Sequence, residues 1–228
     1  MKSWTAQEFG RIDDVLKLVD VPEPAPPPPG CMTVNVLAAG VGLPDVLMTM
    51  GTYPLVTRPP VSPGQEVVGI VTAVAEGVPY AVGDRVLATS LFSHNSGGFS
   101  QQCYVATELA SKVPAGMPDE QAAGFIIPYQ TAHCALVQRC QIQAGESLLV
   151  LGASGSSGSA AIQLGKALGA TVIAVAGGEQ KSAFCQSIGA DHVVDYRKGP
   201  IAEQVRERVG SVDIIFDPGG GGVFQDAV

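Results

Sequence analysis

The second half of the chain alternates short apolar runs with segments whose apolar residues recur every three or four positions. The apolar runs lack a period-two alternation, which is typical of strands that are covered on both faces of a sheet. We expect strands at 147–153, 171–176, 192–196 and 212–217. We expect helices between them at 156–169, 179–189 and 200–210. This order predicts βαβ units and a parallel sheet.

The first half has a different pattern, in which short β-type runs are separated by glycine and proline. The clearest runs lie at 32–39, 66–75 and 84–90, and they predict a compact, mostly antiparallel β domain. The proline-rich segment 22–30 is interpreted as a stiff loop between two strands. The alternative is a polyproline II ligand for an SH3-type partner.

The two patterns meet near residue 120. We therefore predict an α/β protein with one domain at 1–120 and a second at 121–228. A helix is expected to begin at Asp119, acting as its N-cap, and to continue through Val137 as the bridge between the domains.

Composition narrows the class of protein. The chain has 228 residues, of which 46% are apolar and 15% charged, so it has enough apolar material for a core. Its net charge of −8 argues against a nucleic-acid partner. Five scattered cysteines form no CxxC pair, and no segment is typical of a signal peptide or a membrane span. We expect reduced thiols and a cytoplasmic protein with no membrane partner.

The segment LGASGSSGSAA (151–161) leaves a predicted strand and enters a predicted helix. Glycines at a spacing of three permit a tight turn, close approach of the backbone to a pyrophosphate, and close packing of helix against strand. The alternative is a turn without a ligand. The residues expected to contact a dinucleotide here are Gly152, Ala153, Ser154, Gly155, Ser156, Ser157 and Gly158.

The end of the second predicted strand bears on the choice of dinucleotide. Sites for NAD usually place an acidic residue at this point to hold the ribose hydroxyl, whereas this chain has Gly177 and Gly178. Glu179 is the discordant residue. Cationic or phenolic side chains that suit a 2′-phosphate follow nearby, at Lys181, Tyr196 and Arg197. The pattern favours NADPH, bound with Gly178, Lys181 and Tyr196, over NADH.

Several motifs in order along the chain resemble one family. They are AAGVGLPDVLMTMGTYP (38–54), PGQEVVGIVTAVAEGV (63–78), VGDRV (82–86), GGFSQQCYV (97–105), VLGASGSSGSAAIQLGKALGATVIAV (150–175), IGADHVVDY (188–196) and VDIIFDPGGG (212–221). The chain resembles the zinc-free quinone oxidoreductases, related to zeta-crystallin, of the medium-chain dehydrogenase/reductase superfamily. The resemblance implies an N-terminal GroES-like β domain, a Rossmann domain, and a cofactor in the cleft between them.

The chain departs from the family at informative positions. Ser156 and Ser157 replace Gly and Val of the family's loop, and Gly42 stands where a polar Asn normally faces the substrate. Leu43 and Gln65 occupy positions where zinc-dependent members carry Cys and His. Zinc needs three or four N, S or O ligands. The three histidines, which show no ligand spacing, are His94, His133 and His192. We therefore expect no metal site.

The resemblance also implies roles for single residues. Tyr53 is expected to line the substrate cleft and to hydrogen-bond a carbonyl. Tyr53 and Gly42 are the candidate catalytic positions. Thr131 is expected to hold the carboxamide of nicotinamide. Asp45 and Glu66 are expected to bond loop amides around the cleft and so to have a structural role; the alternative is direct catalysis.

Three functions remain open at this stage. The first is NADPH-dependent reduction of a quinone or a similar electrophilic carbonyl compound without zinc. The second is reduction of an activated C=C bond, as in enoyl-CoA or 2-alkenal reductases. The third is an NADPH-binding structural or regulatory protein with little catalysis, which Gly42 favours.

The resemblance has a consequence for the end of the sequence. Family members usually continue for about a hundred residues more, and their sheet has the strand order 3-2-1-4-5-6. We expect this chain to supply strands one to four, so that the sheet is truncated after its fourth strand, whether by fragmentation or as a natural short form. We expect a homodimer in the full-length protein.

Overall fold

The computed structural model describes residues 1–227, which fall into two compact units. The first unit is Met1–Ile127, and the second begins at Pro128. Each unit has its own sheet and its own apolar core, so each is described by itself.

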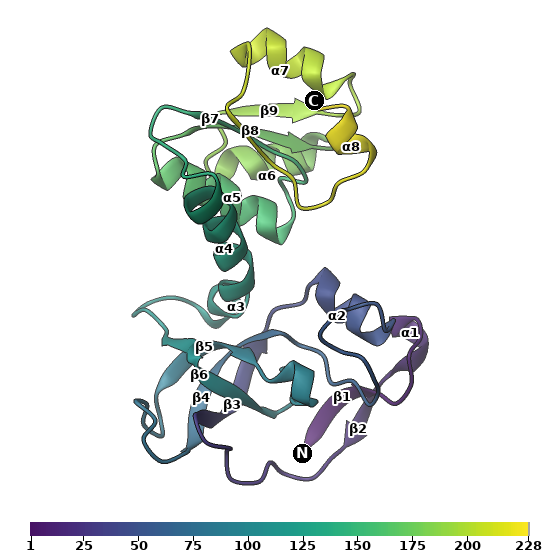
Figure 1. Ribbon diagram of the computed structural model, residues 1–228, viewed down its shortest axis with the longest axis vertical. Helices are drawn as coiled ribbons and strands as arrows, with labels where there is room; N and C mark the ends of the chain where they lie inside the picture. Colours follow the sequence, from purple (N-terminus) through teal and green to yellow (C-terminus); the bar gives the residue numbers. More distant parts are fainter. Residues whose placement is uncertain (228) are drawn as a thin grey trace. The chain divides into compact units, whose positions relative to one another are not determined.

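The first unit is built around a closed four-stranded antiparallel barrel (Figure 1). Its strands are β3 (Cys31–Ala39), β4 (Glu66–Val74), β5 (Arg85–Ser90) and β6 (Gln102–Lys112). The barrel is filled by alternate apolar side chains of these strands, among them Met32, Val67 and Val105. The antiparallel β domain predicted from the sequence is therefore confirmed.

A two-stranded antiparallel sheet and four short helical segments complete this unit. The strands are β1 (Lys2–Ala6) and β2 (Leu16–Asp20). The helical segments are α1 (Ile12–Val15), α2 (Leu43–Thr49), the 3₁₀ turn η1 (Phe92–His94) and α3 (Asp119–Ala123). Segment 22–30 connects β2 to β3, as expected for a loop between strands.

The long helix predicted from Asp119 through Val137 is wrong in two respects. Pro118, with an extended backbone, is the N-cap of α3, and Asp119 is the first helical residue. The Asp119 carboxylate accepts hydrogen bonds from Arg85 instead of capping the helix. The helix also stops at Gly124, because glycine is a poor helix former. It resumes as α4 (Ile126–His133), followed by the π-helical turn η2 (Cys134–Arg139).

The second unit contains a four-stranded parallel sheet in the order β10-β7-β8-β9. Its strands are β7 (Ser147–Val150), β8 (Thr171–Ala176), β9 (His192–Asp195) and β10 (Ile214–Phe216). When the strands are numbered 1 to 4 along the chain, their spatial order in the sheet is 3-2-1-4. This is the Rossmann order that the sequence predicted, and it confirms the α/β fold class.

Helices cover both faces of this sheet, as Figure 1 shows. The helices that follow β7, β8, β9 and β10 are α5 (Ser156–Ala167), α6 (Glu179–Ser187), α7 (Ile201–Val209) and α8 (Gly222–Gln225). One face packs against α5 and α6 through residues such as Leu148 and Val172. The opposite face packs against α7 through Leu149 and Ile173. Burial of successive strand residues on opposite faces explains why the sequence shows uninterrupted apolar runs.

The carboxyl ends of the parallel strands meet at one edge of the sheet, where α/β proteins usually bind ligands.

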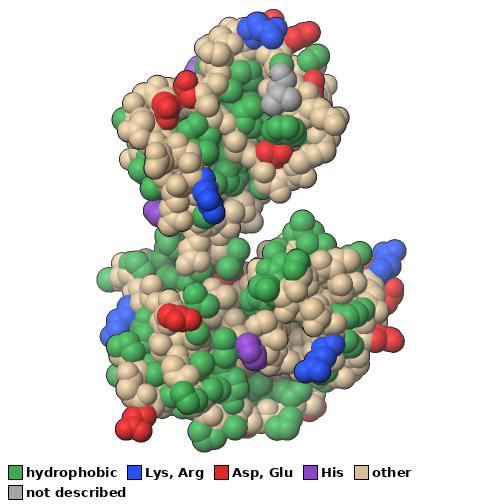
Figure 2. Space-filling view, viewed as in Figure 1, with side chains coloured by type: hydrophobic (Ala, Val, Ile, Leu, Met, Phe, Trp, Pro, Cys, Tyr) green, Lys and Arg blue, Asp and Glu red, His purple; other side chains and the backbone are tan. Residues whose placement is uncertain are grey.

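On the face drawn in Figure 2, apolar and uncharged polar side chains outnumber charged ones, in keeping with 15% charged residues. None of the helices in residues 1–227 is long and apolar enough to cross a bilayer.

Candidate functional site

The glycine-rich segment forms a tight turn between β7 and α5. Gly152 has a φ of +58°, in the left-handed region that favours glycine. The Gly155 N–H closes the turn by donating to the Gly152 carbonyl at 2.9 Å. The Ala153 N–H donates to the Val175 carbonyl of β8 at 3.1 Å, which fixes the turn against the neighbouring strand.

The glycines of this turn are not equivalent. A Cβ at Gly158 would lie 2.4 Å from the Gly152 oxygen and 2.7 Å from the Ala153 Cα, which are overlaps with backbone. A Cβ at Gly155 would lie 3.3 Å from the Gly152 oxygen, at an ordinary φ of −79°. Gly158 is therefore the position that brings the first turn of α5 directly against the loop.

The first turn of α5 has free backbone donors. The N–H groups of Ser156, Ser157 and Gly158 have no acceptor among residues 1–227, as expected for the first turn of a helix. Since α5 has 12 residues, its aligned peptide dipoles place a partial positive charge of about half a unit at this end. The turn and the helix end together fit the pyrophosphate of a dinucleotide.

The two glycines after β8 lie against the two residues after β9. A Cβ at Gly177 would lie 2.4 Å from the Tyr196 Oη. A Cβ at Gly178 would overlap the Arg197 guanidinium, and Gly178 has a φ of +93°. No side chain fits at either glycine without displacing its neighbour, so the phenol and the guanidinium occupy the space where an acidic side chain would project in an NAD site.

Asp195 organises this corner, and the sequence did not identify it. The parallel register pairs Asp195 with Ala176, so its buried carboxylate lies beside the turn after β8. It accepts the Gly178 N–H at 3.2 Å and the Arg197 N–H at 3.0 Å, and the Arg197 Nε lies 3.4 Å away. These contacts lower the pKa of Asp195 below its usual value, and the hydrogen bond from the Arg197 N–H has the largest effect. The signal available in the sequence was an acidic residue ending the third strand.

Two other predicted cofactor residues lie on helices. Lys181 is exposed on the first turn of α6, and no carboxylate in residues 1–227 pairs with it. Thr131 is exposed on α4. The structure thus brings Gly178, Tyr196 and Arg197 together at the end of β8, with Lys181 on the adjoining helical turn.

In the first unit, Tyr53 is held in a defined environment. Its hydroxyl oxygen accepts the Gln65 Nε2–H at 2.7 Å, and Gln65 is buried. Its ring packs edge-on against Phe92 with centroids 6.0 Å apart. The Tyr53 proton has no acceptor among residues 1–227. The Tyr53 hydroxyl therefore accepts one hydrogen bond and keeps a proton to donate.

Gly42 lies in the same unit, just before α2, and has its own partner. Its N–H donates to the Asp45 Oδ2 at 2.8 Å, and the Asp45 Oδ1 accepts the Gly64 N–H at 2.8 Å. Burial raises the pKa of Asp45, against the effect of these hydrogen bonds. Asp45 therefore ties the start of α2 to the loop before β4, which agrees with the structural role expected for it.

Glu66 has a comparable arrangement. Its Oε2 accepts the Ile127 N–H at 2.9 Å, and a Cβ at Gly40 would lie 2.6 Å from its Oε1. Burial raises the pKa of Glu66 to about 7, and the nearby Asp45 charge adds to this effect.

This pKa predicts how one substitution changes stability with pH. The folded pKa of Glu66 lies above its ordinary value of 4.5, so ionisation lowers the free energy of unfolding as pH rises from about 4.5 to about 7. Glu66→Gln keeps an acceptor for the Ile127 N–H and removes the charge. We expect it to raise Tm by about 2–4 °C at about pH 8 and to have little effect at about pH 5. Thermal unfolding at both pH values checks this, and an equal change at both would contradict it.

Comparison with known proteins identifies the family. Residues 28–133 match the alcohol dehydrogenase GroES-like domain, and residues 158–228 match the family described as zinc-binding dehydrogenase. The quinone oxidoreductase of Thermus thermophilus, whose structures include a complex with NADPH, is 32% identical. The similarity covers 99% of this chain and 69% of that one, with a TM-score of 0.83. The chain belongs to the quinone oxidoreductase family of the medium-chain dehydrogenase/reductase superfamily.

Two further similar proteins support the assignment of this chain to the quinone oxidoreductase family. A probable oxidoreductase from Mycobacterium abscessus is 39% identical, with a TM-score of 0.87, over 100% of this chain and 70% of that one. The quinone oxidoreductase of Lama guanicoe is 34% identical over 221 residues, which are 95% of this chain. The chain spans 66% of the length of that curated relative.

The chain is also similar to part of a much larger enzyme. It is 32% identical over 219 residues to a highly reducing polyketide synthase of Arthrinium phaeospermum. That similarity covers 92% of this chain and 9% of the synthase.

The family description mentions zinc, which requires a set of ligating side chains. Within residues 1–227, no group of three or more His, Cys, Asp or Glu side chains is placed to hold a metal ion. Leu43 is 69% exposed, and Gln65 is engaged with Tyr53. This family member therefore has neither side chain type that zinc-dependent relatives use at those two positions.

Proposed function

We propose that the chain forms the NADPH-binding and acceptor-binding part of a reductase that transfers hydride to a quinone without a metal. The proposal rests on one observation: after β8, the Tyr196 and Arg197 side chains lie directly against Gly177 and Gly178. A guanidinium and a phenol suit a 2′-phosphate. An acidic side chain at either glycine would have to displace Tyr196 or Arg197.

The residues of the second unit have distinct roles in this proposal. The free N–H groups of Ser156, Ser157 and Gly158 would hold the pyrophosphate. Arg197 and Lys181 would pair with the 2′-phosphate, and Gly152, Ala153, Ser154 and Gly155 would form the turn beneath the cofactor. Thr131 would hold the nicotinamide carboxamide. Bound NADPH supplies the hydride, and the protein supplies orientation.

Tyr53 would act on the acceptor. Reduction of a quinone adds one hydride and one proton, and negative charge grows on the carbonyl oxygen as hydride arrives. Because the Tyr53 oxygen already accepts from Gln65, its proton is directed elsewhere and can stabilise that charge. The Gly42 position contributes no side chain, so Tyr53 is the residue we assign to this contact.

The relatives support the same reading. The Lama guanicoe relative is named a quinone oxidoreductase, and the Thermus thermophilus enzyme binds NADPH. Similarity to a highly reducing polyketide synthase favours a second candidate, reduction of a C=C bond conjugated to a carbonyl group. An NADPH-binding protein without turnover is the third.

Acceptor turnover distinguishes these candidates. Oxidation of NADPH should be fast with 1,4-benzoquinone and slow with crotonyl-CoA or 2-alkenals if the first proposal holds. The reverse order would favour the second candidate. Tight NADPH binding without turnover of any acceptor would favour the third.

Metal removal is a separate prediction. Because Leu43 and Gln65 cannot supply the usual zinc ligands, dialysis against a strong chelator should leave the rate with 1,4-benzoquinone unchanged. Elemental analysis should find no stoichiometric zinc. A rate lost on chelation and restored by added zinc would contradict the metal-free proposal.

A further inference from the structure

The first unit contains a cavity of about 700 Å³ that the proposed reductase function does not use. It lies between the segment after Tyr53 and the turn η1. Its volume is in the range of small-molecule sites. The residues that line it are Leu55, Val56, Thr57, Arg58, Pro59, Pro60, Phe92, Ser93, His94 and Asn95.

The chain is acidic overall, whereas the lining of this cavity is basic. The chain has 21 acidic and 13 basic residues, yet the lining contains Arg58 and His94 and no carboxylate. No carboxylate in residues 1–227 lies within 4.0 Å of Arg58, whereas Arg11 has two at that distance and Arg85 has one. The Arg58 guanidinium is therefore a free cation at a cavity without acidic residues.

Neutral donors accompany this cation. The Ser93 Oγ lies 3.2 Å from the His94 Nδ1. When the hydroxyl donates to Nδ1, the proton of the neutral ring is on Nε2, which is then a free donor. Asn95, in the left-handed region with a φ of +61°, adds an amide to the same turn. These groups suit an anion better than a cation.

Apart from Thr57, the remaining lining residues are apolar. Leu55 is 62% exposed, and with Phe92, Val56 and two prolines it gives the cavity a nonpolar wall. Exposure of a large apolar side chain next to a free cation fits a ligand with both an acid group and an apolar body.

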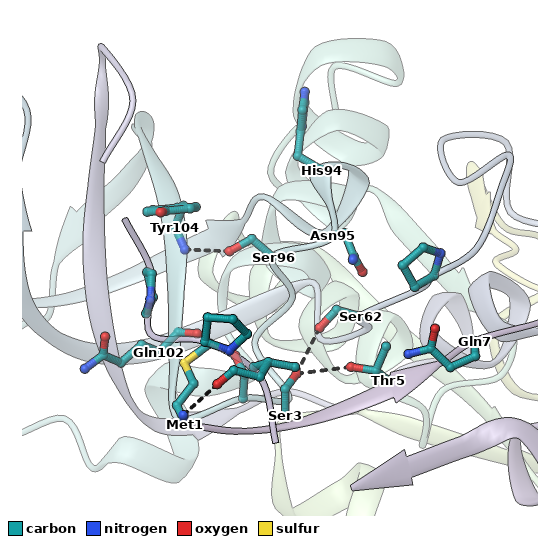
Figure 3. Close-up of a pocket in the computed structure, with 15 residues that line it drawn as sticks. Met1, Ser3, Thr5, Gln7, Ser62, His94, Asn95, Ser96, Gln102 and Tyr104 are labelled. Carbon is teal, nitrogen blue, oxygen red and sulfur yellow. Dashed lines mark hydrogen bonds between the residues drawn. The ribbon is translucent and has the colours of Figure 1, made fainter. Parts of the chain in front are cut away.

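A neighbouring cavity provides a contrast. It shares Pro60, His94 and Asn95 with the Arg58 cavity. In Figure 3, Ser3, Thr5 and Ser62 lie close together and His94 points away from them. Its volume is about 380 Å³, and these hydroxyls bond one another, with the Ser3 and Ser62 Oγ atoms 3.3 Å apart. These three hydroxyls already have partners, whereas the Arg58 guanidinium has no carboxylate partner in residues 1–227, so the Arg58 cavity is the stronger candidate.

We propose that the Arg58 cavity binds a small organic anion, whose acid group pairs with Arg58 and whose apolar body lies against Leu55 and Phe92. Phe92 also packs against Tyr53, and the Val56 N–H donates to the Tyr53 carbonyl at 3.0 Å. A ligand in this cavity therefore contacts residues that support Tyr53.

Calorimetric titration of the chain with 1-naphthalenesulfonate tests the proposal. The neutral analogue 1-naphthalenemethanol and inorganic sulfate separate the contributions of the acid group and the apolar body. We expect the sulfonate to bind at least about ten-fold more tightly than either, because a charge-assisted contact and an apolar contact act together.

The variants Arg58→Gln and Arg58→Lys, with Arg11→Gln as a matched control on the same unit, locate the site. Arg58→Gln should weaken sulfonate binding about ten-fold, Arg58→Lys less, and Arg11→Gln not at all. NADPH affinity and Tm should be unchanged in all three, which separates this site from the proposed cofactor site. Equal binding of sulfonate and alcohol, or unchanged sulfonate binding in Arg58→Gln, would overturn the proposal.

Discussion

Replacing Gly158 with valine should abolish dinucleotide binding, with a loss of affinity of at least about 100-fold. The reason is steric, since even the first side-chain atom would lie 2.4 Å from the Gly152 oxygen and 2.7 Å from the Ala153 Cα. These atoms belong to the backbone of the turn, which cannot give way as a flexible side chain would. The loop must open, and the donors of the first turn of α5 lose their common direction. A fluorescence titration with NADPH measures the effect.

Gly155→Ala is the matched control. Its Cβ would lie 3.3 Å from the same oxygen at an ordinary φ, so we expect a loss of less than about ten-fold. Circular dichroism and Tm show whether each variant is folded, and Gly158→Ala provides a milder form of the same overlap. If folded Gly158→Val bound NADPH as well as the unmodified chain, the assignment of the pyrophosphate to this loop would be wrong.

Arg197→Gln should give the second large effect, a selective loss of NADPH affinity. A charge-assisted contact to phosphate contributes about 1.5–3 kcal/mol, so NADPH binding should weaken about ten-fold or more. The loss should be larger than for removal of a cation that has no acidic neighbour. The Asp195 carboxylate lies 3.4 Å from the Arg197 Nε, and without the guanidinium its charge would repel the phosphate. NADH lacks the 2′-phosphate and should bind with little change.

Two further variants sharpen this test. Arg197→Lys keeps the charge and should retain part of the NADPH affinity. Lys181→Ala should also weaken NADPH selectively, by about 1 kcal/mol, since Lys181 lies one turn away on α6. An equal loss of NADPH and NADH affinity in Arg197→Gln would show that the residue supports the fold and does not select the phosphate.

The Rossmann sheet could be predicted because its signals are local. Apolar runs of strand length alternate with helices that end in glycine, and the order of four parallel strands follows from the fold class. The observed bounds differ by a few residues, as at 147–153, where the strand itself is Ser147–Val150. The last three residues of that prediction form the turn, which the glycines require.

Other elements could not be predicted because their signals are weak or depend on distant partners. The strand β2 (Leu16–Asp20) has no fully buried residue, so its apolar pattern is faint. The break at Gly124 was hidden within a long apolar stretch. Asp119 has a good sequence for an N-cap, but its carboxylate pairs with Arg85, 34 residues away.

The candidate site shows the same division. The phosphate loop is one continuous segment, so its spacing identified it. The corner after β8 is assembled from two segments, and only the β8–β9 register reveals that Asp195 lies beside Gly178 and that Arg197 covers it. Sequence spacing likewise treats Gly155 and Gly158 alike, whereas the packing of α5 separates them.

We expect the second unit to bind NADPH in preference to NADH. Calorimetric titration of the unmodified chain with NADPH and with NADH, at the same ionic strength, tests it most directly. We expect one NADPH bound per chain, and NADH binding at least about ten-fold weaker because NADH lacks the phosphate that Arg197 and Lys181 would bind. Equal affinity for the two, or tighter binding of NADH, would contradict it.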